Sequence, residues 1–176
     1  MAVAATGFFD GVHPGHRKVI ETLIRVARER GEESLILTFW PHPRMVLGSA
    51  PETFRLINSL EEKKSKLYGL GVDRIEVIPF TTDFAALTAR EYIAGVIRDY
   101  GISAMVLGYD TRMGSDQLCP DEIAAVCAGM GIDCFTVPPV EVNTPGGNVT
   151  VSSTKIRRAL EEGDERLASS LLGYSK

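Results

Sequence analysis

Short apolar runs alternate with longer segments of helical periodicity along most of the chain. Strands bury side chains at a period of two and helices at a period of 3.6, so the short runs predict strands and the longer segments predict helices. The predicted strands are residues 2–5, 35–39, 74–78, 104–107, 134–137 and 149–151. The predicted helices are residues 14–30, 59–68, 88–100 and 120–130, with a last helix beginning at Ser153.

Capping signals and glycines mark where these elements begin and end. Ser59 and Thr88 are each followed three residues later by a glutamate, the reciprocal capping pattern of a helix start, and Pro120 suits a first helical position. Glycines at positions 71, 101 and 131 each stand after a predicted helix and before a predicted strand. Their regular spacing matches the length of a βα unit. The sequence therefore predicts an α/β fold, a Rossmann-like doubly wound parallel sheet with its ligand site at the carboxyl ends of the strands.

Composition narrows the class of protein. The 176 residues suit one domain spanning the chain, and 44% hydrophobic with 24% charged residues is typical of a globular protein. A formal net charge of -4 argues against broad nucleic-acid binding, which needs a basic face. No apolar run is long enough to cross a bilayer and no leader pattern precedes the first strand, so we expect no membrane partner and a cytoplasmic location. The three cysteines form no C-x-x-C pair, which favours buried thiols over a zinc site.

The stretch from Gly7 to Arg17, GFFDGVHPGHR, stands between the first predicted strand and the first predicted helix. A glycine-rich turn that leads into a helix start is where backbone N–H groups converge on phosphate. His13 and His16 are three residues apart, so on a helix start both side chains lie on one face. A lone histidine in such a turn more often caps or packs, but here the spacing and the context agree.

The last predicted helix has its charges the wrong way round. We expect Ser153 to be its N-cap, so that Lys155, Arg157 and Arg158 crowd the positive end of the helix dipole while Glu161 and Glu162 lie toward the negative end. Each exposed charge placed in this way costs about 0.3–1 kcal/mol, which indicates an anion at this helix start. The first predicted helix shows the same inversion, with His16, Arg17 and Lys18 in its opening turns, and two such helix starts in one chain predict a polyphosphate clamp. The alternative is that these cations are solvated surface residues.

The motifs carry a family resemblance. HPGH at residues 13–16 and SSTKIR at 152–157 match the H-x-G-H and S-S-T-x-x-R signatures of the α/β nucleotidyltransferases. More closely, five segments in order resemble the FMN adenylyltransferase domain of bacterial bifunctional riboflavin kinase/FAD synthetases. These segments are GFFDGVHPGHR, TFWPHPR at 38–44, EEKKSKL at 61–67, GYDTRMG at 108–114 and VSSTKIRRALEEGD at 151–164.

The resemblance implies a Mg²⁺-dependent reaction in which the phosphate of FMN attacks ATP and gives FAD and pyrophosphate. Catalysis of this kind is mostly positioning and charge stabilisation. The resemblance assigns catalytic roles to His13, His16 and Arg157. It assigns nucleotide binding to Gly7, Phe8, Asp10, Gly15, Gly108, Asp110, Arg112, Ser152, Ser153 and Thr154. It leaves His42, Thr111 and Met113 as candidates for contact with the acceptor, and it names no metal ligand.

Two departures keep alternatives open. Thr111 and Met113 stand where the family usually has phenylalanines, which removes two aromatic surfaces from a loop expected to meet a flavin ring. The chain also stops about where the family's riboflavin kinase domain would begin, so we expect no kinase activity. One alternative is a nucleotidyltransferase for another small phosphorylated acceptor. The other is a nucleotide- or flavin-binding module without turnover. The sequence does not indicate an oligomeric state.

Overall fold

The computed structural model describes residues 1–50 and 54–175, and its centre is a parallel sheet. The strand order is β3-β2-β1-β4-β5, and all four neighbouring pairs are parallel. The strands are β1 (Ala2–Thr6), β2 (Glu33–Trp40), β3 (Arg74–Pro79), β4 (Ile102–Gly108) and β5 (Asp133–Val137). From β1 the chain first adds β2 and β3 on one side, and then returns to add β4 and β5 on the other side of β1. This order confirms the doubly wound prediction.

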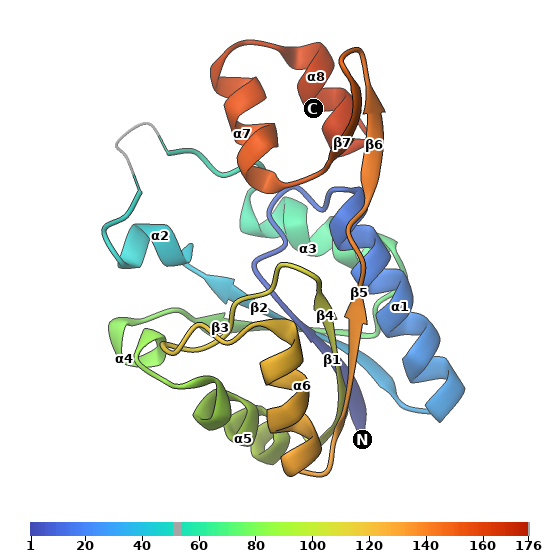
Figure 1. Ribbon diagram of the computed structural model, residues 1–176, viewed down its shortest axis with the longest axis vertical. Coiled ribbons are helices and arrows are strands. Elements are labelled where there is room, and N and C mark those ends of the chain that lie inside the picture. The colour runs from blue at the N-terminus through green and yellow to red at the C-terminus, as the bar shows by residue number, and fades with distance from the viewer. Residues whose placement is uncertain (51–53, 176) are drawn as a thin grey trace.

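The helices cover both faces of the sheet (Figure 1). They are α1 (Pro14–Arg30), α2 (Pro43–Val46), α3 (Leu60–Gly69), α4 (Thr82–Ala85), α5 (Ala89–Tyr100), α6 (Pro120–Gly129), α7 (Ser153–Glu161) and α8 (Glu165–Leu172). The capping boxes predicted at Ser59 and Thr88 are present. No helix among residues 1–50 and 54–175 is both long and apolar enough to span a membrane.

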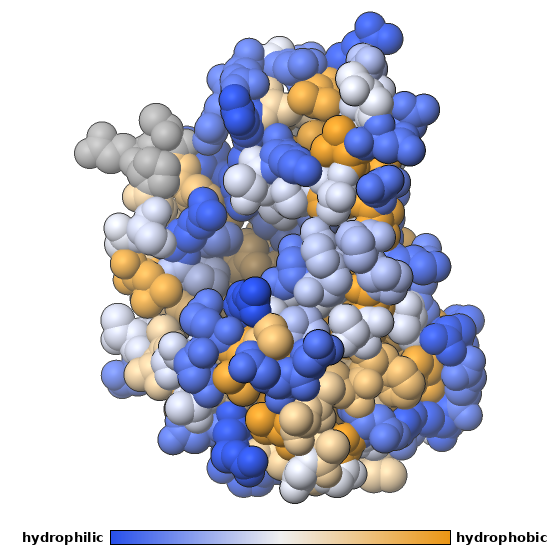
Figure 2. Space-filling model, in the orientation of Figure 1, coloured by the Kyte–Doolittle hydropathy of each residue, from blue (hydrophilic) through white to orange (hydrophobic). Residues whose placement is uncertain are grey.

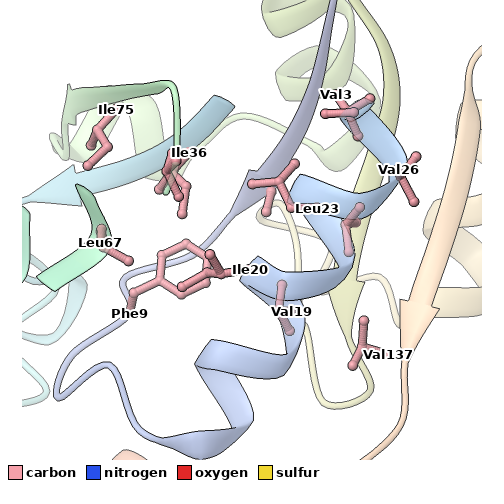
Figure 3. Close-up of a cluster of buried hydrophobic side chains, with 14 of the residues drawn as sticks. Val3, Phe9, Val19, Ile20, Leu23, Val26, Ile36, Leu67, Ile75 and Val137 are labelled. Atoms are coloured by element: carbon pink, nitrogen blue, oxygen red, sulfur yellow. The ribbon is translucent and has the colours of Figure 1, made fainter. Parts of the chain in front are cut away.

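The side chains of the central strands divide between two cores, as the period of two requires. Val3 and Ala5 of β1 face a cluster with α1 and α3, whereas Ala2 and Ala4 face a cluster with α5 and α6. All four are at most 2% exposed, which fits a strand covered on both faces. Figure 3 shows the first cluster, in which Phe9 lies close to Ile20 of α1. The turn after β1 is therefore anchored in the core.

The C-terminal part forms a smaller unit with its own core. A hairpin of β6 (Glu141–Thr144) and β7 (Gly147–Thr150) packs with α7 and α8, above the end of the sheet in Figure 1. The predicted strand at residues 149–151 overlaps β7, but β7 pairs antiparallel with β6 and does not join the main sheet. The sequence prediction missed β6, α2, α4 and α8. Elements α2 and α4 have four residues each, too few for a periodic signal.

Candidate active site

The predicted phosphate-binding turn joins β1 to α1 at the point where the strand order reverses. Thr6 ends β1, and Pro14 begins α1 behind an N-cap provided by His13. Phe9 and Val12 have positive φ angles of 54° and 41°, and Gly11 has 86°, so the turn is tight. Gly15 is required for space, because a Cβ there would lie 3.1 Å from Cε1 of His13. A residue larger than glycine would push the His13 ring away.

The two histidines form a stacked pair at this helix start. Their ring centroids are 3.6 Å apart with an interplanar angle of 18°. Nδ1 of His13 accepts a hydrogen bond of 3.3 Å from the backbone N–H of His16, which assigns the ring proton of neutral His13 to Nε2. Burial lowers the pKa of His13 to about 4. Burial and the neighbouring His13 hold the pKa of His16 well below its usual value. At neutral pH both imidazoles are therefore uncharged.

The second helix start, at α7, faces the same space. The N-cap of α7 is Ser152, whose hydroxyl accepts from the N–H of Lys155 at 3.3 Å. The prediction that Ser153 is the N-cap is therefore wrong by one residue, because the chain is already helical at Ser153. The Ser153 hydroxyl donates instead to the carbonyl oxygen of Asp10 at 2.8 Å. This bond joins the start of α7 to the turn after β1.

A cavity of about 270 Å³ lies between the two helix starts, and we call it the polar cavity. Most of the predicted nucleotide-binding residues line it. They are Gly7, Phe8, Gly15, Gly108, Asp110, Ser152, Ser153 and Thr154. His13 and His16, predicted as catalytic, and Thr111, predicted to contact the acceptor, line it too. Val137, Pro138 and Val140 add an apolar side. Figure 2 shows the molecule hollowed between the C-terminal unit above and the body of the sheet below.

Asp10 and Arg157 lie outside the lining of the polar cavity and pair with each other. Nη1 of Arg157 is 2.8 Å from Oδ2 of Asp10, and the two side chains are 11% and 3% exposed. The Asp10 carboxylate also accepts backbone N–H bonds from Ile57 and Asn58, at 3.0 and 3.1 Å. The Arg157 guanidinium lies over the ring of Phe54, 5.0 Å from its centroid. Asp10 therefore ties α7 and the segment before α3 to the turn. The Asp10 carboxylate and the Phe54 ring together hold the Arg157 side chain in place.

The other cations at the two helix starts do not face the polar cavity. Arg17 donates to the carbonyl oxygens of Val12 and Leu172, and so fastens the end of α8 to α1. Arg158 pairs with Glu162 on the exposed surface, and Lys155 donates to the carbonyl oxygen of Thr150. The inverted charges thus pointed to the correct two helix starts. They did not indicate which side chains face the polar cavity, because most of these cations hold other parts of the fold together or lie in solvent.

A second cavity of about 470 Å³ adjoins the first, and we call it the aromatic cavity. Five rings line it, contributed by separate elements: Phe8, Phe39, Phe80, Phe84 and Tyr92. Arg112 and Met113 line it as well, and Met113 is 5% exposed and joins the core beside α5. Both cavities share Thr6, Gly7, Phe8 and Thr111. The rings were missed in the sequence because no local motif collects them.

His42 lies beside the aromatic cavity without lining it. Its ring packs on Phe8, with centroids 4.2 Å apart, and its Nδ1 accepts from the backbone N–H of Arg44 at 3.1 Å, which caps α2. Burial, with the charges of Arg157 and Arg44, lowers the pKa of His42 to about 4. His42 therefore supports the wall as a neutral ring.

The comparison with known families decides the class of the chain. Residues 1–155 match the family model described as FAD synthetase. The chain belongs to the FAD synthetase family. A bifunctional riboflavin kinase/FMN adenylyltransferase of Listeria monocytogenes is 35% identical over 98% of this chain and 54% of its own length. An FAD synthetase of the same organism is 28% identical over 98% of this chain and 69% of its own length.

The fold of this FAD synthetase family chain also has solved neighbours. A crystal structure described as a macrolide-efflux protein from Streptococcus pneumoniae has a TM-score of 0.84 and 31% identity, covering 98% of this chain and 55% of that chain. A pantothenate synthetase from Thermus thermophilus has a TM-score of 0.52 at 14% identity, which bears on the fold alone. The chain spans about half the length of the bifunctional relatives that it matches.

The part of this FAD synthetase family chain that the structure describes holds no cluster of three His, Cys, Asp or Glu side chains suited to a metal ion. Asp110, which follows β4, is the one carboxylate among the described residues that line the polar cavity. Mg²⁺ typically keeps several waters and binds through one or two carboxylates together with substrate phosphates. A single carboxylate beside a phosphate-sized space fits that mode of binding and does not fit an all-protein metal cage.

Proposed function

We propose that this chain is an FMN adenylyltransferase, which converts FMN and ATP to FAD and pyrophosphate. The observation that carries the proposal is the pair of adjoining cavities. One has the helix starts and hydrogen-bond donors that suit a triphosphate, and the other has the aromatic rings that suit a flavin. Their shared wall is where the acceptor phosphate would meet the α-phosphorus of ATP.

In this proposal ATP lies in the polar cavity with its phosphates between α1 and α7. The N-terminal N–H groups of both helices point partial positive charge at that space. Ser152, Ser153 and Thr154 contribute short polar side chains from one side, and His13 and His16 contribute neutral rings from the other. Negative charge grows on the pyrophosphate as it leaves. Fixed donors aimed at that charge lower the barrier.

The chemical step needs no enzyme nucleophile. A phosphate oxygen of FMN forms a bond to the α-phosphorus of ATP, and the bond from that phosphorus to the oxygen bridging the α- and β-phosphates breaks. The electron pair leaves with pyrophosphate. A phosphate monoester is already largely dianionic at neutral pH, so no general base is required. Mg²⁺, when bound, supplies charge neutralisation on the phosphates, and Asp110 is the residue that we expect to hold it.

The aromatic cavity supports FMN as the acceptor despite Thr111 and Met113. The family's loop phenylalanines are replaced there, but Phe39, Phe80, Phe84 and Tyr92 supply ring surfaces from other elements. Met113 both lines this cavity and packs into the core beside α5, so its side chain forms part of the cavity wall. This aromatic lining favours a phosphorylated acceptor that carries a flat ring system over a small phosphorylated acceptor without one.

The decisive experiment incubates the purified protein with FMN, ATP and Mg²⁺ and separates the products by chromatography. We expect FAD and pyrophosphate in equal amounts. A panel of other phosphorylated acceptors serves as the control. Pyrophosphate release with another acceptor but not with FMN would overturn the flavin assignment, and ATP binding without turnover of any acceptor would indicate a binding module.

The cytoplasmic location, the single-domain organisation and the absence of nucleic-acid partners stay predictions from the sequence. We infer the location from the class of reaction, since FMN and ATP are metabolites of the cell interior. Binding of labelled RNA or DNA at physiological salt would contradict the prediction about nucleic acids.

A further inference from the structure

Lys63 is a buried cation directly behind the phosphate-binding turn. It lies on α3, within the EEKKSKL segment, and its side chain is only 2% exposed. Its Nζ donates to the carbonyl oxygen of Phe8 at 2.9 Å and to Oγ1 of Thr38 at 3.0 Å. The same ammonium lies 3.8 Å from the centroid of the Phe8 ring. One charged group thus holds both the backbone and the ring of Phe8.

This position is an unusual place for a lysine. A fully buried lysine is rare unless it is paired, and within residues 1–50 and 54–175 Lys63 forms no ion pair within 4.0 Å. The acid whose charge acts on Lys63 is Asp10, and the Asp10 carboxylate pairs with Arg157. Leu67, one turn further along α3, is fully buried in the apolar core. An apolar residue at position 63 would continue that face without the cost of burying a charge.

Phe8 is the residue that gives this contact its importance, because it lines both cavities. It precedes Phe9, the first left-handed residue of the turn that leads to His13. A shift of the Phe8 carbonyl or ring would therefore move the wall between the two substrates. Misplacement of reacting groups by about 1 Å can cost on the order of 100-fold in rate.

We propose that Lys63 is a positioning residue for adenylyl transfer, which fixes Phe8 from behind so that the two substrates meet in line across the shared wall. The assignment rests on the proposed function. Lys63 itself is not among the residues that line either cavity. Its ammonium also lies close enough to His16 and His42 to disfavour their protonation, so it helps to keep both rings neutral.

The first test compares Lys63→Met with Lys64→Met. Both changes remove one lysine from α3, but the Lys64 side chain has no hydrogen bond or ion pair in the described structure. We expect Lys63→Met to lower kcat for FAD formation about 10- to 100-fold with a smaller change in the KM for ATP, and Lys64→Met to stay within about twofold. A normal kcat in a folded Lys63→Met protein would overturn the proposal.

The second test uses the wild-type protein. Burial, opposed by the charge of Asp10, lowers the pKa of Lys63 to about 8. The other groups that face it are the Asp10–Arg157 pair, His16 and His42, and both histidines are already neutral in this range. We expect kcat to fall as the pH rises through about 8, because the ammonium loses its charge. A flat wild-type profile, or the same fall in Lys63→Met, would contradict the proposal.

A third readout separates this proposal from the function. The ring of His42 packs on Phe8, so its proton NMR signal reports the position of that ring. We expect the His42 signal to move and the pKa of His42 to rise in Lys63→Met but not in Lys64→Met. An unchanged signal would overturn the proposal.

If wild-type protein makes no FAD, the proposed function fails, and the His42 signal still decides the role of Lys63. If Lys63→Met does not fold, Lys63→Gln, which keeps a donor, replaces it in all three measurements.

Discussion

The polar cavity and the aromatic cavity share a wall but are built in different ways. The polar cavity is formed by two helix starts and short polar or glycine residues, which come from a few contiguous stretches. The aromatic cavity is formed by single rings from β2, the segment after β3, α4 and α5. The first depends on backbone geometry and the second on packed surfaces. Phosphate binding is therefore encoded in local sequence here, whereas the acceptor site is assembled only by the fold.

The largest expected effect comes from the polar cavity. We expect His16→Ala to lower kcat by about 100- to 1000-fold, on the order of removing one transition-state donor, while FMN still binds in the aromatic cavity. The measurements are steady-state FAD formation and FMN binding by flavin fluorescence. Arg25→Ala, on the exposed face of the same helix, is the control. A variant at His16 that keeps a near-normal rate would show that its role was misassigned.

The next effect concerns the support of the polar cavity. We expect Arg157→Ala to lower the free energy of unfolding by about 3 kcal/mol, because it leaves the buried Asp10 carboxylate without its counter-charge. Arg158→Ala removes an exposed pair on the same helix and should cost less than about 0.5 kcal/mol. Urea unfolding measures both. Equal losses in the two variants would mean that burial of the pair has no energetic consequence.

Acid should destabilise the folded protein through its three histidines. The pKa values of His13, His16 and His42 are lowered in the folded protein, so the unfolded chain binds more protons below its usual pKa. Their stabilising contribution is complete above about pH 6.5 and is lost as the pH falls toward about 4. Between about pH 7 and 6 we expect a loss of roughly 2 kcal/mol by urea unfolding. His42→Asn, which keeps a capping side chain, should reduce that loss by about a third.

The smallest effect tests the aromatic cavity alone. We expect Phe84→Leu to weaken FMN binding about 3- to 10-fold, because one stacking surface of roughly 1 kcal/mol is lost, and to leave the KM for ATP nearly unchanged. Phe135→Leu, at a ring packed against the core around α1, is the matched control. Equal effects on the two substrates would show that the cavities are not separate binding sites.

The sequence predicted the polar cavity well because its residues lie in short motifs with local signals. The two helix starts, the pairing of the histidines on one face and the doubly wound parallel sheet followed from capping, spacing and periodicity, and the structure confirms them. The directions of the cationic side chains could not be predicted, because a charge at a helix start does not determine which way its side chain points. Arg17 turns to α8 and Arg157 to Asp10.

The aromatic cavity and Lys63 could not be predicted in the same way. Phe80 precedes α4 and Phe84 lies within it, and this helix is too short to detect from the sequence, while Tyr92 fits the core face of α5. Lys63 stands in a charged run whose other members are at least partly exposed, so its burial has no signal in the pattern. Only the packing of α3 against the turn after β1 reveals it.

The shared wall offers a rule for redesign. Thr6, Gly7, Phe8 and Thr111 belong to both cavities, so a change at any of them alters both substrates together. Phe80, Phe84 and Leu87 line only the acceptor side and lie outside the sheet. An engineer who wishes to exchange the acceptor and keep the nucleotide should therefore begin with these three positions. The positions that can be changed without altering nucleotide binding are therefore distinct from the positions that serve both substrates.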